Sequence, residues 1–231
     1  AEVIETRHVE DNGVLNRTFI TGAYAHVNFF NENEGTGKNT YLDEGHSSHD
    51  SMLQLGYSEL SDASIEASYT FELDGEGADV RLRMAALSKD KEKKHYEVHI
   101  KHNAPHTTGI MDNYGVAKDE AHLVIDGIGT ITNGQNGSAS HQTNKIIVFD
   151  PKCYASANPF LYIDEYDVQA SHAAGVGKMD EEHLYYLQSR GLTKRQAMQL
   201  ITYGYLMPVV EVVDNKMIKE RFELALSKVG A

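Results

Sequence analysis

A single change of hydrophobic pattern limits what this chain can fold into. In residues 1–170 apolar and polar side chains alternate, as at Val80, Leu82 and Met84, whereas residues 178–231 carry apolar side chains at helical spacing. The first pattern predicts short β-strands separated by glycine-containing turns such as Asp126-Gly127. The second predicts short amphipathic helices. We therefore divide the chain into a strand domain, residues 1–177, and a C-terminal helical subdomain, residues 178–231.

The strand pattern by itself fits two architectures. Clear strand-like runs occupy residues 67–73, 78–84, 95–102, 121–125, 145–149 and 159–166. Many short strands with glycine turns are typical of an antiparallel sandwich or barrel, and also of a β-solenoid. If Val80, Val98, Val124 and Ile147 are taken as the inward-facing residues of successive coils, they are 18, 26 and 23 residues apart. These unequal spacings leave the choice open. The polar segment 31–38 predicts a loop.

The helical subdomain has clear start and stop signals. Asp180 can cap a first helix, which Gly191 would end. Thr193 and Gln196 have the spacing of a capping box and predict a second helix, ending at Pro208. A third helix is predicted after Asp214.

Charge and cysteine content exclude several functions. The chain has 21 Lys and Arg against 34 Asp and Glu, a net charge of −13, which argues against nucleic acid or an anionic membrane as the main partner. A single cysteine, Cys153, excludes an internal disulfide and any CxxC metal motif. We find no secretory signal and no membrane-length apolar run, and we expect a cytoplasmic protein. Because the chain starts at Ala1 without Met, we also expect that a further N-terminal domain can precede it.

Two groups of histidines are candidate metal sites, although surface histidines are the more ordinary explanation. His99, His102 and His106 lie close in sequence. On a strand, however, His99 and His102 would point to opposite faces because their separation is odd. His46 and His49 form an HxxH pair in a segment rich in Ser and Asp.

Motifs for enzyme chemistry are missing, and we expect no enzyme. The sequence has no GxSxG or HExxH motif, and the segment 35–40 only imitates a phosphate-binding loop. Cys153, as a lone thiol, is more often structural than reactive. The most unusual residue is His172, which lies among Ser171, Ala173, Ala174 and Gly175. Such small neighbours let another chain or a cofactor approach the imidazole closely.

Several segments together resemble a known family. The junction 167–177, which contains SHAAGVG, and the segment 185–192, YYLQSRGL, resemble the signature of the SufB/SufD scaffold proteins of iron–sulfur cluster assembly. Weaker matches lie at residues 75–82, 102–107, 126–129, 142–144 and 158–167. The resemblance covers about residues 55–207. The segment 144–149 lacks the cysteine of the SufB branch, and Ala173 stands where that branch tends to have Glu, so the chain is more similar to SufD.

The resemblance implies a right-handed parallel β-helix followed by a small helical subdomain. It also implies a non-enzymatic scaffold that pairs with a SufB-like chain, or with itself when alone, and docks a SufC-type ATPase. His172 matches the family's interface histidine and would contribute to a cluster site shared between two chains. The iron–sulfur cluster would be assembled transiently, since one thiol cannot hold a cluster alone.

The resemblance also implies that the helical tail docks the ATPase. We predict that exposed tail positions, among them Tyr203, Leu206 and Met207, make this contact. Two alternatives remain: a metal-binding module that uses the histidines, and a carbohydrate-acting β-solenoid, which the absence of Trp weakens.

Overall fold

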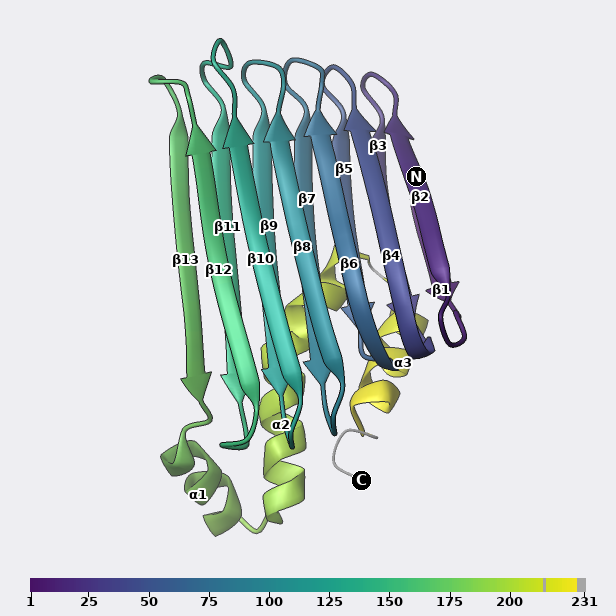
Figure 1. The fold of residues 1–231 in the computed structure, drawn as a ribbon, viewed down its shortest axis with the longest axis vertical. Coiled ribbons are helices and arrows are strands. Elements are labelled where there is room, and N and C mark those ends of the chain that lie inside the picture. The colour runs from purple at the N-terminus through teal and green to yellow at the C-terminus, as the bar shows by residue number, and fades with distance from the viewer. Residues whose placement is uncertain (214, 228–231) are drawn as a thin grey trace.

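The chain winds into a solenoid whose strands form two parallel β-sheets that lie face to face, with helices along one side (Figure 1). The computed structural model describes residues 1–213 and 215–227. Successive strands alternate between the sheets, and each strand pairs in parallel with the strand two places away. The seven-stranded sheet consists of β1 (Glu2–Arg7), β3 (His26–Asn33), β5 (Met52–Glu59), β7 (Asp79–Ser88), β9 (Thr108–Ala117), β11 (Ala139–Val148) and β13 (Gln169–Lys178). The six-stranded sheet consists of β2 (Val14–Thr21), β4 (Thr36–Ser47), β6 (Asp62–Leu73), β8 (Lys93–His102), β10 (His122–Ile131) and β12 (Tyr154–Ile163). This architecture confirms the solenoid and excludes the antiparallel sandwich.

The coils of the solenoid are more regular in length than the spacings between Val80, Val98, Val124 and Ile147 indicate. Hydrogen-bonded neighbours in adjacent coils are 26 residues apart near the N-terminus and 31 apart at β9 and β11. Val80 and Val98 are buried but lie in different sheets, while Val124 and Ile147 sit in the outward rows of β10 and β11. The spacings of 18, 26 and 23 residues therefore compared positions that are not equivalent.

The prediction of a loop over residues 31–38 is wrong for all but residues 34 and 35, which connect two strands. Residues 31–33 end β3 and residues 36–38 begin β4. Asn33 donates to the buried carboxylate of Glu59, at 2.7 Å, and accepts from the hydroxyl of Tyr41. Glu59 also pairs with the buried guanidinium of Arg7. A polar residue with such partners can be buried at little cost.

One column of turns repeats a left-handed residue in each coil. Tyr24, Asp50, Gly77, His106 and Gly137 all have φ between 49° and 74°. The backbone N–H of each donates to a carbonyl in the corresponding turn of the next coil. His106 therefore occupies a position that the turn geometry defines, at which asparagine, aspartate, histidine and glycine are favoured.

Two α-helices, α2 (Lys194–Leu206) and α3 (Lys216–Ser227), and a 3₁₀ helix, η1 (Met207–Val212), lie against the outer face of the seven-stranded sheet (Figure 1). A further α-helix, α1 (Glu181–Ser189), lies beyond the end of β13. Asp180 caps α1, Gly191 follows it with φ 96°, and Thr193 and Gln196 form the capping box of α2, as predicted. Pro208 lies in the first turn of η1, so the chain continues there as a tighter helix. The predicted cap Asp214 lies outside the described residues.

The helices are attached by a second apolar core. Outward-facing residues of the sheet, including Phe30, Leu87 and Val116, pack against Val210 and Phe222 of the helical subdomain. The main core fills the solenoid and contains a run of buried tyrosines, of which Tyr57 and Tyr69 stack with ring centroids 4.4 Å apart. Among residues 1–213 and 215–227, no helix has both the length and the apolar character that a bilayer span requires.

Candidate functional site

The open end of the solenoid at β12 and β13 is the most unusual surface of the molecule. Every residue of β13 is exposed, and no residue of β12 is fully buried. In the part of the chain that the structure describes, no further coil and no helix covers these two strands. Phe160, Tyr162 and Val176 are exposed there. A solenoid end with apolar side chains and free strand edges is suited to contact another protein.

The two edge strands differ in their ability to pair with another strand. Residues of even number in β12 donate their N–H groups to β10, so Pro159, which has no N–H, lies on the free side of that strand. A proline at this position blunts the edge. In β13 the odd-numbered residues donate to β11, so the even-numbered residues, such as Ala174, direct their N–H groups outward. The described β13 contains no proline, and this edge is open to a further strand.

The open edge carries His172 in its inward row. His172 pairs in register with Gln142 of β11, which pairs with Met111 of β9, and both of those residues are buried inside the solenoid. Because side-chain directions repeat from coil to coil, His172 extends this buried row to the end of the solenoid. It is exposed because β13 is the last strand in the sheet. The imidazole is therefore available to a group that a partner chain supplies.

A buried polar layer lies directly behind His172. Asn113 donates to Asn144 at 2.8 Å, and Gln142 donates to the carbonyl of Phe160 at 2.8 Å. Gly127 leaves room for this layer, since a Cβ there would lie within 2.5 Å of both Gln142 and Asn144. The Gln142 Oε1 and Asn144 Nδ2 atoms have no hydrogen-bond partner among the described residues. The interior of the solenoid is thus polar where it meets the open end.

The three histidines near residue 100 do not form a metal site. His99 lies in the outward row and contacts Thr130 at 2.9 Å, whereas His102 is fully buried and contacts Thr107 at 2.7 Å. The prediction that these two face opposite ways is confirmed. Burial lowers the pKa of His102 to about 4, so the ring is neutral at physiological pH. His106 lies in the turn column described above.

Cys153 is placed far from His172 along the strands. It lies in the turn before β12, a turn that neighbours the end of β13 at Lys178, whereas His172 is close to the start of β13. The thiol is partly buried, and burial raises its pKa above the usual value. Cys153 therefore has the features of a structural thiol rather than of a cluster ligand beside His172.

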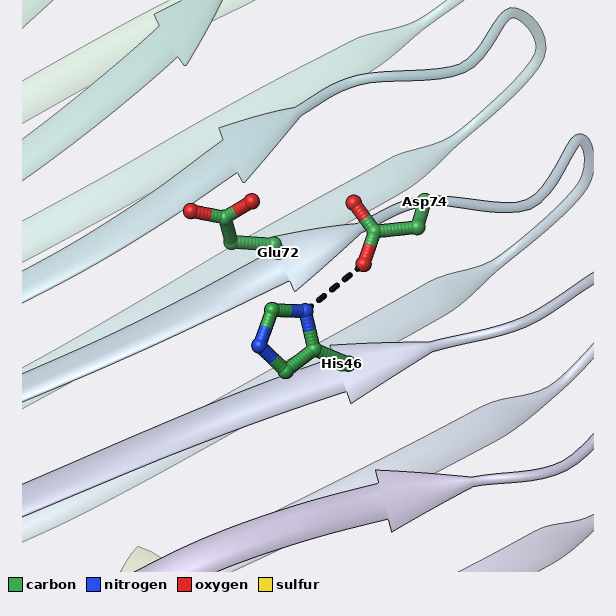
Figure 2. Close-up of side chains that lie close together, drawn as sticks. All are labelled: His46, Glu72 and Asp74. Atoms are coloured by element: carbon green, nitrogen blue, oxygen red, sulfur yellow. Dashed lines mark hydrogen bonds and ion pairs between the residues drawn. The ribbon is translucent and has the colours of Figure 1, made fainter.

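The HxxH pair separates in the structure, and His46 joins two carboxylates instead. Figure 2 shows His46 of β4 beside Glu72 of β6 and Asp74, which follows that strand. One ligand atom from each of the three residues lies within 4.8 Å of the others. His49 instead contacts Asp50 and the ring of Tyr24. The sequence analysis missed Glu72 and Asp74, which lie one coil length from His46 and could be found only once that length was known.

Of the three predicted docking residues of the tail, one is buried and two are partly exposed. Leu206 is completely buried between the helices and the sheet, so its prediction as an exposed position is wrong. Helical periodicity alone did not reveal that α2 packs this residue inward. Met207 and Tyr203 are partly buried against the same core, and the Tyr203 hydroxyl donates to Glu223. Exposed apolar residues of the helices are Tyr185, Tyr186, Leu200, Met217 and Leu224.

Two adjoining clefts lie between the helices and the end of β11. One, of about 520 Å³, separates α1 and α2 from the turn at residues 149–151. The other, of about 310 Å³, is lined by apolar Phe149 and Met198 and by basic Lys118, Lys194 and Arg195. In a chain of net charge −13, this group of basic side chains is a local exception.

Comparisons with known proteins agree with one another. The family model for the SUF system FeS cluster assembly, SufBD core domain, matches residues 1–205. The iron-sulfur cluster assembly protein SufD of Bacillus subtilis (strain 168) is 31% identical over 205 residues, covering 87% of this chain and 47% of that protein. SufD of Escherichia coli (strain K12) is 23% identical over 171 residues, covering 74% and 40%. SufB of Bacillus subtilis is 26% identical over 158 residues, covering 65% and 34%. The chain thus spans about half the length of these relatives or less. The family match begins at residue 1 rather than near residue 55, and it ends at residue 205.

Proposed function

This chain belongs to the SufBD core family of the SUF iron–sulfur cluster assembly system, on its SufD-like side, and from that membership we propose how it works there. We propose that it is a non-enzymatic, cytoplasmic scaffold that pairs with a SufB-like chain through β13. The open strand edge beside His172 is the observation that carries this proposal.

The pairing follows from the chemistry of the strand edge. Outward N–H and C=O groups along β13 lose their hydrogen bonds to water on burial unless a partner strand replaces them. Pro159 hinders such pairing at β12. A partner strand is therefore expected at β13, where small side chains from Ala170 to Gly175 permit close approach.

The cluster site would be shared between the two chains. Iron–sulfur clusters are held mainly by thiolates, with histidine as an occasional ligand. This chain offers His172 at the open end, while its single thiol lies at the other end of the strands. The partner would supply the thiolates, and His172 would supply one nitrogen ligand to the nascent cluster.

The helical subdomain would dock a SufC-type ATPase. The clefts beside α1 and α2 combine apolar lining residues with basic side chains at Lys118, Lys194 and Arg195. A matching partner surface would present apolar side chains surrounded by carboxylates. The exposed Leu200 belongs to the same helix and is a better docking candidate than the buried Leu206.

Co-expression with a SufB-type protein and a SufC-type ATPase tests the proposal. We expect one complex that contains all three chains, identified by affinity capture and native mass spectrometry. His172→Ala should leave this complex intact and reduce cluster assembly, read by the absorbance of the iron–sulfur chromophore. A wild-type chain that captures neither protein, or a His172→Ala variant with unchanged assembly, would contradict the proposal.

A further inference from the structure

We propose that the outer surface of the six-stranded sheet binds one divalent first-row transition-metal ion through His46, Glu72 and Asp74. This site is separate from the open end at β13, and the inference does not rest on the proposed function. The donor set of one imidazole and two carboxylates suits Zn²⁺, Fe²⁺ or Mn²⁺.

The strand register brings the three donors together. His46 pairs directly with Glu72, and both face outward from the sheet. Asp74 is two residues beyond Glu72, so its side chain leaves the same face, and its carboxylate lies 2.8 Å from His46 Nδ1 (Figure 2). Ligand atoms around a tetrahedral ion are about 3.4 Å apart. The three donors lie within 4.8 Å of one another, so rotations of exposed side chains can close the site.

The surrounding residues hold the carboxylates together when no ion is bound. Asn103 donates from Nδ2 to Glu72 at 2.7 Å and to Asp74 at 2.8 Å. Rotation of this amide by half a turn would present its oxygen to a cation as a fourth ligand. Lys101 lies 3.3 Å from Glu72 and supplies a positive charge that an ion would replace.

A second histidine shows what distinguishes this arrangement. His95 also contacts one Glu and one Asp, but Glu66 lies at its Nδ1, at 2.6 Å, and Asp126 at its Nε2, at 2.9 Å. The carboxylates are thus on opposite sides of the ring and cannot share an ion with it. At His46, by contrast, one ring nitrogen and one oxygen of each carboxylate lie within 4.8 Å of one another, so all three can reach the same ion. His95 is therefore a matched control.

Asp74 offers its ionised carboxylate to a cation. Partial burial raises the pKa of Asp74, but hydrogen bonds from Asn103 and His46 outweigh this and lower it.

Calorimetric titration of the untagged chain with Zn²⁺, supported by Co²⁺ absorption spectra, tests the site. We expect about one equivalent of ion to bind to the wild type, and at least a tenfold weaker affinity for His46→Ala and for Glu72→Gln. His95→Ala should bind as the wild type does. Lys101→Ala should bind up to about fivefold more tightly, because the competing charge is gone.

Circular dichroism checks that the exposed variants remain folded. The proposal is overturned if the wild type binds no ion, if His46→Ala binds it with unchanged affinity, or if His95→Ala weakens binding as much as His46→Ala does.

Discussion

At the scale of single residues, environment rather than residue type separates the histidines. His102 is buried with its Nδ1 on Thr107, His106 serves a left-handed turn, His46 meets two carboxylates and His172 ends a buried row. The same side chain is thus a core residue, a turn residue, a proposed metal ligand and a proposed interface residue.

The buried His102 should make stability depend on pH. Its pKa is lowered to about 4 by burial, while the unfolded chain titrates near the ordinary value of about 6.5. Stability is therefore complete above about pH 6.5 and is lost as pH falls from there toward 4, because only the unfolded state takes up the proton. Between pH 7 and 4.5 we expect a loss of about 2–3 kcal/mol from this group. Urea unfolding at both pH values measures it.

His102→Gln is the control for this prediction, since it keeps a polar group beside Thr107 and removes the titration. The variant should lose less stability on acidification than the wild type. An equal loss in both proteins would show that other groups cause the acid sensitivity.

At the scale of elements, the turns and the helical tail each have their own requirements. Each turn of the column requires a residue with positive φ. The helical tail requires that its apolar faces pack against the seven-stranded sheet. The residues that cap the helices are close neighbours in the sequence, so they could be predicted, and the structure confirms them. The surface against which each apolar helix face packs is distant in the sequence, so it could not be predicted in the same way.

The turn that holds Gly137 contains a second glycine, Gly134, and substitution of the two is predicted to have different costs. Gly134 and Gly137 both have positive φ, but only at Gly137 would a Cβ meet a neighbour, 2.3 Å from the His106 ring. Gly134→Ala should cost about 1–2 kcal/mol from backbone conformation alone. Gly137→Ala should cost about 1–3 kcal/mol more, because the ring must move. Equal unfolding free energies for the two variants would contradict the close approach of the His106 ring to Gly137.

The helical tail predicts a contrast between two leucines. Leu206→Ala removes a fully buried side chain and should lower stability by about 2–5 kcal/mol. Leu224→Ala, at a position 60% exposed, should change it by less than about 0.5 kcal/mol. Thermal unfolding of both variants checks this. Similar effects would mean that the tail is not attached through Leu206.

At the scale of the whole molecule, the solenoid ends at edge strands, β1 and β2 at one end and β12 and β13 at the other, and the described chain leaves the edge of β13 uncovered. Such an edge exposes backbone donors and acceptors, and proteins usually cover or blunt it. Proline blunts β12, whereas β13 retains its full set of outward groups. Self-association is therefore expected when the SufB-like partner is absent.

Two proline variants separate edge pairing from folding. Ala174→Pro removes an N–H group that points away from the sheet. It should lower the fraction of the chain that self-associates as a dimer, measured by analytical ultracentrifugation, while the fold is retained. Ala173→Pro removes an N–H that donates to β11, and should lower thermal stability instead. A dimer that survives Ala174→Pro in a folded protein would place the contact elsewhere.

The sequence by itself determined the strand-to-helix division, the helix caps, the opposite faces of His99 and His102, and, through the resemblance, the solenoid and the family. These features depend on near neighbours or on motifs. Only the tertiary structure decided that residues 31–33 form a buried strand end, that Leu206 is inaccessible and that His46 meets Glu72 and Asp74. The first and the last depend on contacts between coils 26 or more residues apart, and the burial of Leu206 depends on packing of the helices against the distant sheet. The four residues that were meant to give the coil length came from different sheets and faces. Pairing at that distance is set by the winding of the solenoid, which local periodicity does not encode.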